Sequence, residues 1–68
     1  MTNTKLLKSK ILLAGYTQRS LASKAKMSKN TLNAKINNRA SFDTNEIELL
    51  CSLLHIYDPV EKCEIFLS

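Results

Sequence analysis

Residues 28–39, SKNTLNAKINNR, carry many side chains that form hydrogen bonds and few that can build a core. On a helix, at about 100° per residue, Leu32 and Ile36 lie about 40° apart and define one inward side. The amides and hydroxyls then point outward, although Asn and Thr disfavour a helix by up to about 0.7 kcal/mol each. The pattern therefore favours a ligand for the outward face. The alternative is a polar, solvated helix in a small bundle.

The outward residue types match the edges of DNA bases. Asparagine can bind adenine through two hydrogen bonds, lysine suits guanine, and an alanine methyl can contact the methyl group of thymine. Residues 28–36 are therefore predicted to form a recognition helix whose N-terminus leads into the major groove of DNA. The DNA-binding positions predicted on this helix and at its end are Ser28, Lys29, Asn30, Thr31, Asn33, Ala34 and Asn37.

Residues on either side are predicted to hold the phosphate backbone. Thr17 and Gln18, at the start of a preceding helix, would offer a hydroxyl, an amide and free backbone N–H groups to a phosphate. Cationic and amide side chains at the other end would hold the flanking backbone. These residues are Lys29, Lys35, Asn38 and Arg39.

The charges are divided along the chain. Residues 1–39 hold nine of the ten Lys and Arg residues and no acid, a formal charge of +9. Residues 40–68 hold all six acids and Lys62, a formal charge of −5. An acid-free segment forgoes stabilising i,i+4 pairs and accumulates repulsion, which a polyanionic partner would offset. Nucleic acid is favoured over a membrane, because the basic positions do not form one amphipathic helix with Trp or Phe opposite.

Helix signals recur along all 68 residues, which predict a single all-α domain of five helices. In residues 4–15, TKLLKSKILLAG, Leu7, Ile11 and Ala14 share one face and Gly15 suits the position after a helix. Residues 18–24 predict the second helix. The fourth carries EIELLCSLL, with a wide apolar face, and the last runs to about residue 67.

Three helix starts show the same arrangement, in which a capping residue is flanked by an apolar pair that can form a hydrophobic staple. The caps and their pairs are Thr17 with Tyr16 and Leu21, Ser28 with Met27 and Leu32, and Asp43 with Phe42 and Ile47. Glu46 would complete a capping box with Asp43. The fifth helix is predicted to start at Asp58, followed by Pro59 and by Glu61 at the third helical position.

Only Ala25, Lys26 and Met27 separate the helix over residues 18–24 from the cap Ser28. So short a connection between two short helices is typical of the angled pair in a helix-turn-helix. The sequence therefore predicts that this pair positions the outward side chains of residues 28–36.

Other kinds of site find little support in the sequence. Cys51, Cys63 and His55 lack the spacing of metal ligands. Both cysteines are predicted to be buried free thiols, with a disulfide as the alternative, and His55 to be a surface or helix-end residue. There is no Gly-rich loop, catalytic triad or carboxylate pair, so neither an enzyme nor a cofactor is predicted. The absence of a membrane span or signal-peptide pattern predicts a soluble, cytoplasmic protein.

Four features carry a family resemblance: Gln18 opening a helix, the pair Leu21-Ala22, the cap Ser28, and INNR where relatives often have NGK or NGR. With them, residues 17–54 resemble the Cro/CI type of helix-turn-helix, the phage and bacterial repressor family. The stretch LNAKINNRASF, with the later EI and EIF, is similar to short Cro-like regulators, including modulators of repression, from temperate phages of Gram-positive bacteria.

The resemblance implies a lysis-lysogeny regulator in the cytoplasm of a bacterial host. The leading expectation is a transcriptional regulator that binds a double-stranded, pseudo-palindromic DNA operator as a homodimer. The alternative is an antirepressor or modulator that binds the cognate phage repressor and alters its DNA binding.

The sequence departs from the family pattern at two turn positions. Lys26 and Asn38 stand where glycine is usual, and a left-handed lysine would cost roughly 1 kcal/mol.

Overall fold

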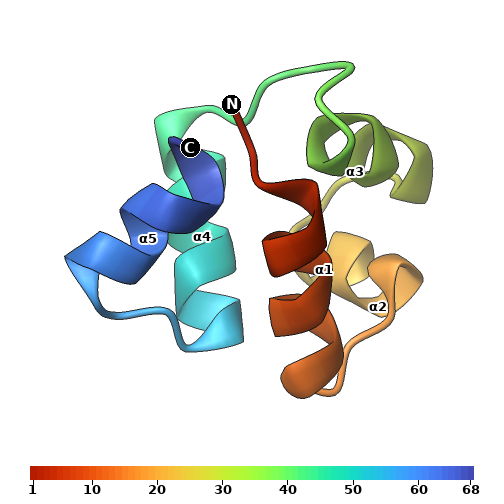
Figure 1. Ribbon diagram of the computed structural model, residues 1–68. Coiled ribbons are helices and arrows are strands. Elements are labelled where there is room, and N and C mark those ends of the chain that lie inside the picture. Colours follow the sequence, from red (N-terminus) through yellow and green to blue (C-terminus); the bar gives the residue numbers. More distant parts are fainter.

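The computed structural model describes all residues, 1–68, and it is all-helical with five helices and no strand (Figure 1). The helices are α1 (Thr4–Leu13), α2 (Gln18–Lys24), α3 (Lys29–Ile36), α4 (Thr44–Leu54) and α5 (Pro59–Phe66). In Figure 1, α1 lies between the α4–α5 side of the molecule and the α2–α3 side. The prediction of an all-α chain with five helices is confirmed. None of the five helices has both the length and the apolar composition of a membrane span.

Each helix begins at a side chain that accepts a hydrogen bond from the backbone of the first turn. Asp43 and Glu46 form the predicted capping box, and Thr17 forms an additional one with Ser20. Asp58 caps α5 with Pro59 as the first helical residue. The predicted N-caps Thr17, Ser28, Asp43 and Asp58 are confirmed, and the structure adds Asn3 at the start of α1.

The core draws on all five helices, because each turns one apolar face inward. The side chains that are fully enclosed are Leu7, Leu21, Leu32, Ile36, Leu50 and Ile65. Tyr16, Met27 and Phe42, the predicted staple residues, pack against this core from positions just before helices. The core leaves no buried side-chain nitrogen or oxygen without a hydrogen-bond partner.

Helices α2 and α3 pack against each other, and α1 contacts both α3 and α5. The turn between α2 and α3 passes through Lys26, whose φ of 57° is left-handed. Asn38, after α3, is also left-handed, with φ of 63°. Both residues therefore adopt the backbone conformation that glycine would satisfy without strain.

The first residues of the chain join two distant parts of the fold. The backbone N–H of Thr2 donates to Asn38 Oδ1, and Asn38 Nδ2 donates to the Thr2 carbonyl, both at 2.9 Å. The Thr4 hydroxyl donates to the Ile36 carbonyl at 2.7 Å, at the end of α3. The N–H of Asn3 donates to the Ile65 carbonyl in α5, also at 2.7 Å. The N-terminal segment therefore fixes the C-terminal end of α3 relative to α5.

The two cysteines differ in exposure. Cys51 is buried in the core and Cys63 is exposed on α5, and both are free thiols. The prediction of burial is right for Cys51 and wrong for Cys63. Cys63 lies on the solvent side of α5, because Ile65 and Phe66 define the inward side of that short helix.

Candidate nucleic-acid interface

Helix α3 separates an apolar inner side from a polar outer side. Leu32 and Ile36 are fully buried, as predicted, and they hold the helix against the core. Lys29 and Asn30 are exposed at its N-terminal end, and their side chains make no hydrogen bond or ion pair within the protein. Ala34 is partly exposed in the next turn. The first turn of α3 thus offers a free ammonium and a free amide to a ligand.

Three predicted site residues form one hydrogen-bonded chain. Asn33 Nδ2 donates to Gln18 Oε1 at 2.9 Å, which links α3 to the start of α2. The Arg39 guanidinium donates to Asn33 Oδ1 at 2.7 Å. Asn33 therefore uses both ends of its amide inside the protein. It aligns Gln18 and Arg39, whose remaining N–H groups are available to a ligand.

Lys35 lies in a different environment from the one predicted. Its ammonium is 2.6 Å from Glu46 Oε1, and its side chain is only 16% exposed. The pair joins α3 to the first turn of α4. Lys35 thus forms an ion pair that links two helices, and it is not a free cation beside α3.

Asn37 and Asn38 are also engaged within the fold. Asn38 binds both backbone groups of Thr2. Asn37 Nδ2 donates to the Asn33 carbonyl at 2.9 Å, in the last turn of α3. Their amides therefore stabilise the end of α3 and its following turn.

The hydroxyl groups in this region serve helix starts. Thr17 Oγ1 accepts from the Ser20 N–H at 3.0 Å. Ser28 Oγ accepts from the Thr31 N–H at 3.0 Å and contacts the Thr31 hydroxyl at 2.9 Å. The backbone N–H groups of Gln18 and Arg19, in the first turn of α2, have no hydrogen-bond partner in the fold.

The cations of the acid-free segment are largely unpaired. Only Lys10 and Lys35 of residues 1–39 form salt bridges, with Glu61 and Glu46. The remaining cations have no acidic partner: Lys5, Lys8, Arg19, Lys24, Lys26, Lys29 and Arg39. The surface around α2 and α3 is therefore strongly positive, which attracts a polyanion.

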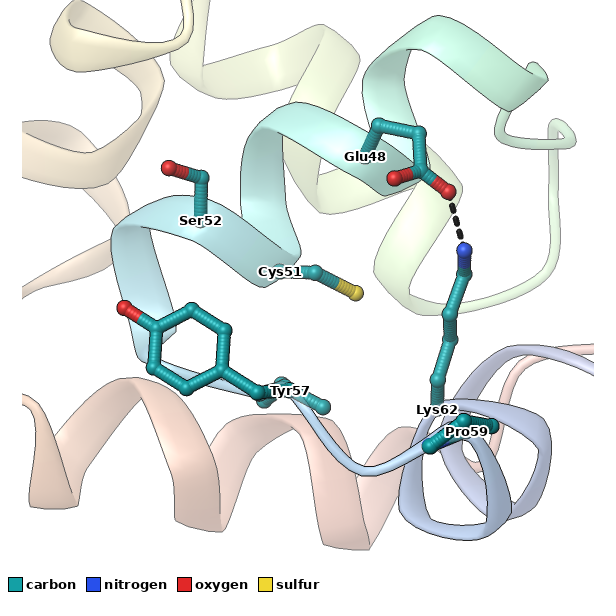
Figure 2. A pocket seen from close by; sticks show the side chains of 7 residues that line it. Glu48, Cys51, Ser52, Tyr57, Pro59 and Lys62 are labelled. Atoms are coloured by element: carbon teal, nitrogen blue, oxygen red, sulfur yellow. Dashed lines mark hydrogen bonds and ion pairs between the residues drawn. The ribbon is translucent and has the colours of Figure 1, made fainter.

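A pocket of about 290 Å³ lies away from this surface, between α4 and α5 (Figure 2). Cys51 lies at its floor, and burial is the main cause that raises the pKa of its thiol. Lys62 at the rim is paired with Glu48, and this hydrogen bond raises the pKa of the ammonium. The pocket thus holds a thiol that ionises less readily than a free cysteine, beside the ion pair of Lys62 and Glu48. No three His, Cys, Asp or Glu side chains are grouped so that they could hold a metal ion.

No protein-family model matches the chain, and comparisons with curated proteins and with solved structures find no significant similarity.

Proposed function

We propose that the protein binds double-stranded DNA in a sequence-specific manner as a transcriptional regulator. In this proposal α2 and α3 form a helix-turn-helix of Cro/CI type, and the N-terminal end of α3 enters the major groove. The observation that carries the proposal is the position of Lys29 and Asn30. Both are exposed and unpaired at the start of α3, on the acid-free side of the molecule.

The residues divide into two roles. Lys29 and Asn30 would contact base edges, with Thr31 and Ala34 beside them. Gln18 and Arg39 would bind phosphates on either side, and Asn33 would hold both in position through its amide. Lys35, Asn37 and Asn38 would support α3 without touching DNA, because their polar groups are already engaged.

The test starts with selection from a random duplex library, followed by measurement of affinity for the selected and a scrambled duplex over a range of salt concentrations. Lys29→Ala should weaken binding and reduce the slope of log K against log salt by about 1, because one phosphate or base contact is lost. Asn30→Ala should weaken binding to the selected duplex by about 1–3 kcal/mol and relax the preference at one position.

Lys62→Ala is the matched control, because it removes the same charge from the other half of the molecule. It should leave affinity for the selected duplex close to that of the wild type. Equal affinity for the selected and scrambled duplexes, or binding that is insensitive to salt, would contradict the proposal.

A second candidate is a protein-binding regulator that pairs with a repressor and alters its DNA binding. It is favoured because two predicted DNA contacts are engaged within the protein: Lys35 pairs with Glu46, and Asn38 binds Thr2. Lys29 and Arg39 then remain as the cations at the two ends of α3. Weak DNA binding by the protein alone, together with a stable complex on co-purification with the repressor of the neighbouring gene, would favour this candidate.

A further inference from the structure

Helix α5 has a second apolar face that points to solvent. At about 100° per residue, Pro59, Cys63, Val60 and the C-cap Leu67 span an arc of about 100°, which lies opposite the buried Ile65 and adjoins the buried Phe66 at its Pro59 edge. Val60 is 63% exposed and Leu67 is 67% exposed. An arc of this width normally faces a core, so its exposure indicates a partner surface. We call these four residues the α5 face.

Helix α1 exposes an apolar residue beside two free lysines. Leu12 is 76% exposed and lies on the same side of the helix as Lys5 and Lys8. A cleft of about 210 Å³ adjoins it, lined by Lys8, Ile11, Leu12, Tyr16 and Gln18. Lys5, Lys8, Leu12 and this cleft form the α1 face.

The two faces carry opposite charges. Glu64 borders the α5 face and Asp58 precedes it, and neither forms a salt bridge. Lys62, the only cation of α5, is neutralised by Glu48. On the α1 face, Lys5 and Lys8 have no acidic partner. Each face is therefore an apolar surface with a charged border that suits the other.

The faces lie on different sides of the molecule. Lys10 of α1 binds Glu61 of α5 at 2.8 Å, which identifies the sides where the two helices meet. Leu12 lies about 160° around α1 from Lys10, and Val60 lies about 100° around α5 from Glu61. In Figure 1, α5 lies on one side of α1, and α2 lies on the other. One molecule therefore cannot join its own two faces, but two molecules can.

We propose that copies of this chain associate head to tail, the α5 face of one copy packing on the α1 face of the next. An apolar side chain of the α5 face would enter the α1 cleft, while Asp58 and Glu64 approach Lys5 and Lys8. A symmetric contact between two α5 faces is disfavoured, because it would gather the Asp58 and Glu64 carboxylates of both copies at one interface with no unpaired cation of α5 to offset them. The inference does not depend on DNA binding.

The association should be weak and reversible. Only Leu12 on one face and Val60 and Leu67 on the other are large exposed apolar residues, so the contact is expected to fall below the roughly 1,200 Å² of a stable specific interface. Because the contact is heterologous, it does not close at two copies. At about 1 mM protein, weak contacts of this kind are populated. Analytical ultracentrifugation should then show an average molar mass that increases with protein concentration and exceeds that of a dimer. Added salt should reduce it by screening the charged borders.

Complementation between two variants tests the pairing without DNA. Leu12→Glu blocks the α1 face, and Val60→Lys blocks the α5 face. Each variant alone should associate at least about tenfold more weakly than the wild type, the effect of losing one anchor residue. An equimolar mixture should restore association but stop at a one-to-one dimer, since each variant keeps the face that the other lacks.

Leu13→Glu is the matched control, because Leu13 is 78% exposed but lies about 100° around α1 from Leu12. It should associate like the wild type, and circular dichroism should show all three variants folded. Three outcomes would overturn the proposal: a wild type that stays monomeric, a Leu12→Glu variant that still forms dimers, or a mixture that remains monomeric. The second outcome would indicate a symmetric α5 contact, and none of the three would bear on the DNA measurements.

Discussion

Four helices are followed by a residue with left-handed backbone, and three of these residues carry a side chain. Gly15 follows α1, Lys26 follows α2, Asn38 follows α3 and His55 follows α4. For a residue with a Cβ this conformation is strained by roughly 1 kcal/mol or more, although Asn tolerates it better than Lys. The side chain of Lys26 makes no hydrogen bond or ion pair to compensate, and its backbone N–H donates to the Ser23 carbonyl at 3.2 Å, a bond that glycine would keep. The α2–α3 turn therefore keeps a strained residue that glycine would relieve.

Lys26→Gly should raise the free energy of unfolding by roughly 0.5–1 kcal/mol, the relief of strain less the added entropy of the unfolded chain. The increase can be measured by urea unfolding and as a rise of several degrees in Tm. Gly15→Ala is the opposite change, since it places a side chain at a left-handed position with φ of +83°. The added Cβ would meet no atom within 4 Å, so it causes no steric clash. It should lower stability by roughly 1 kcal/mol through backbone strain alone. A loss of stability in Lys26→Gly would refute this account of the turn.

The two thiols should differ in reactivity. Cys63 is exposed, whereas Cys51 is buried and burial raises the pKa of its thiol, so less thiolate is present at neutral pH. With a chromogenic disulfide reagent, the folded protein should show one fast-reacting thiol, and the unfolded protein should show two. Cys63→Ser should abolish the fast phase. A fast phase that survives in this variant would mean that Cys51 is accessible.

At the scale of the helices, local sequence determines where each element begins. Thr17, Ser28, Asp43 and Asp58 cap the helices as predicted, because a cap binds backbone N–H groups only two or three residues away. The inward positions of Leu32 and Ile36 were predictable for a related reason, since one helical turn relates them. Asn3 was not predicted as the α1 cap, although an Asn three residues before the apolar Leu6 is a recognisable signal.

The sequence pattern could not predict which side chains meet between helices. Lys35 meets Glu46 across 11 positions, Asn33 meets Gln18 across 15, and Asn38 meets Thr2 across 36. A helical wheel gives the direction of each side chain but not the neighbour that it meets. Which outward polar side chains of α3 are free, and which form hydrogen bonds within the protein, can therefore be told only from the packing of the helices. Cys63 was misassigned because the inward side of a two-turn helix holds few residues.

Asn38→Gly should show how much the bonds to Thr2 contribute. Glycine keeps the left-handed backbone but loses both hydrogen bonds, so the free energy of unfolding should fall by about 1–2 kcal/mol. Asn38→Ala should lose roughly 1 kcal/mol more, because it adds the backbone strain. Chemical unfolding of both variants provides the measurement.

Thr2→Ala is the control for this pair, since Asn38 binds only the backbone of Thr2. It should keep both hydrogen bonds, and its free energy of unfolding should be closer to that of the wild type than that of Asn38→Gly or Asn38→Ala. If Asn38→Gly is as stable as the wild type, the bonds do not hold the N-terminal segment in solution.

At the scale of the whole molecule, charge divides the protein into a basic and an acidic part around one core. The basic part carries α1, α2 and α3, and the acids lie on α4 and α5 and the residues before them. Salt bridges between Lys10 and Glu61 and between Lys35 and Glu46 join the two parts. A molecule divided in this way suits both a polyanion on one side and the opposite side of a second copy.

Head-to-tail association on DNA should favour two binding sites in the same orientation. A head-to-tail contact repeats one operation from copy to copy and lacks the twofold axis that matches an inverted repeat, so it suits sites that repeat in one orientation. Duplexes that carry the selected site twice, as direct or inverted repeats at varied spacing, should show cooperative binding for direct repeats. Leu12→Glu should remove the cooperativity, whereas Leu13→Glu, which adds the same charge to α1, should keep it. Cooperativity confined to inverted repeats would refute this arrangement.

The amide of Asn33 also bears on how recognition could change over evolutionary time. Because one side chain holds both Gln18 and Arg39, a substitution at position 33 disturbs two hydrogen bonds at once. Replacements at these positions should therefore show epistasis, with effects that do not add. A new preference for a DNA sequence would arise more readily through compensating changes at two of the positions 18, 33 and 39 than through a single substitution.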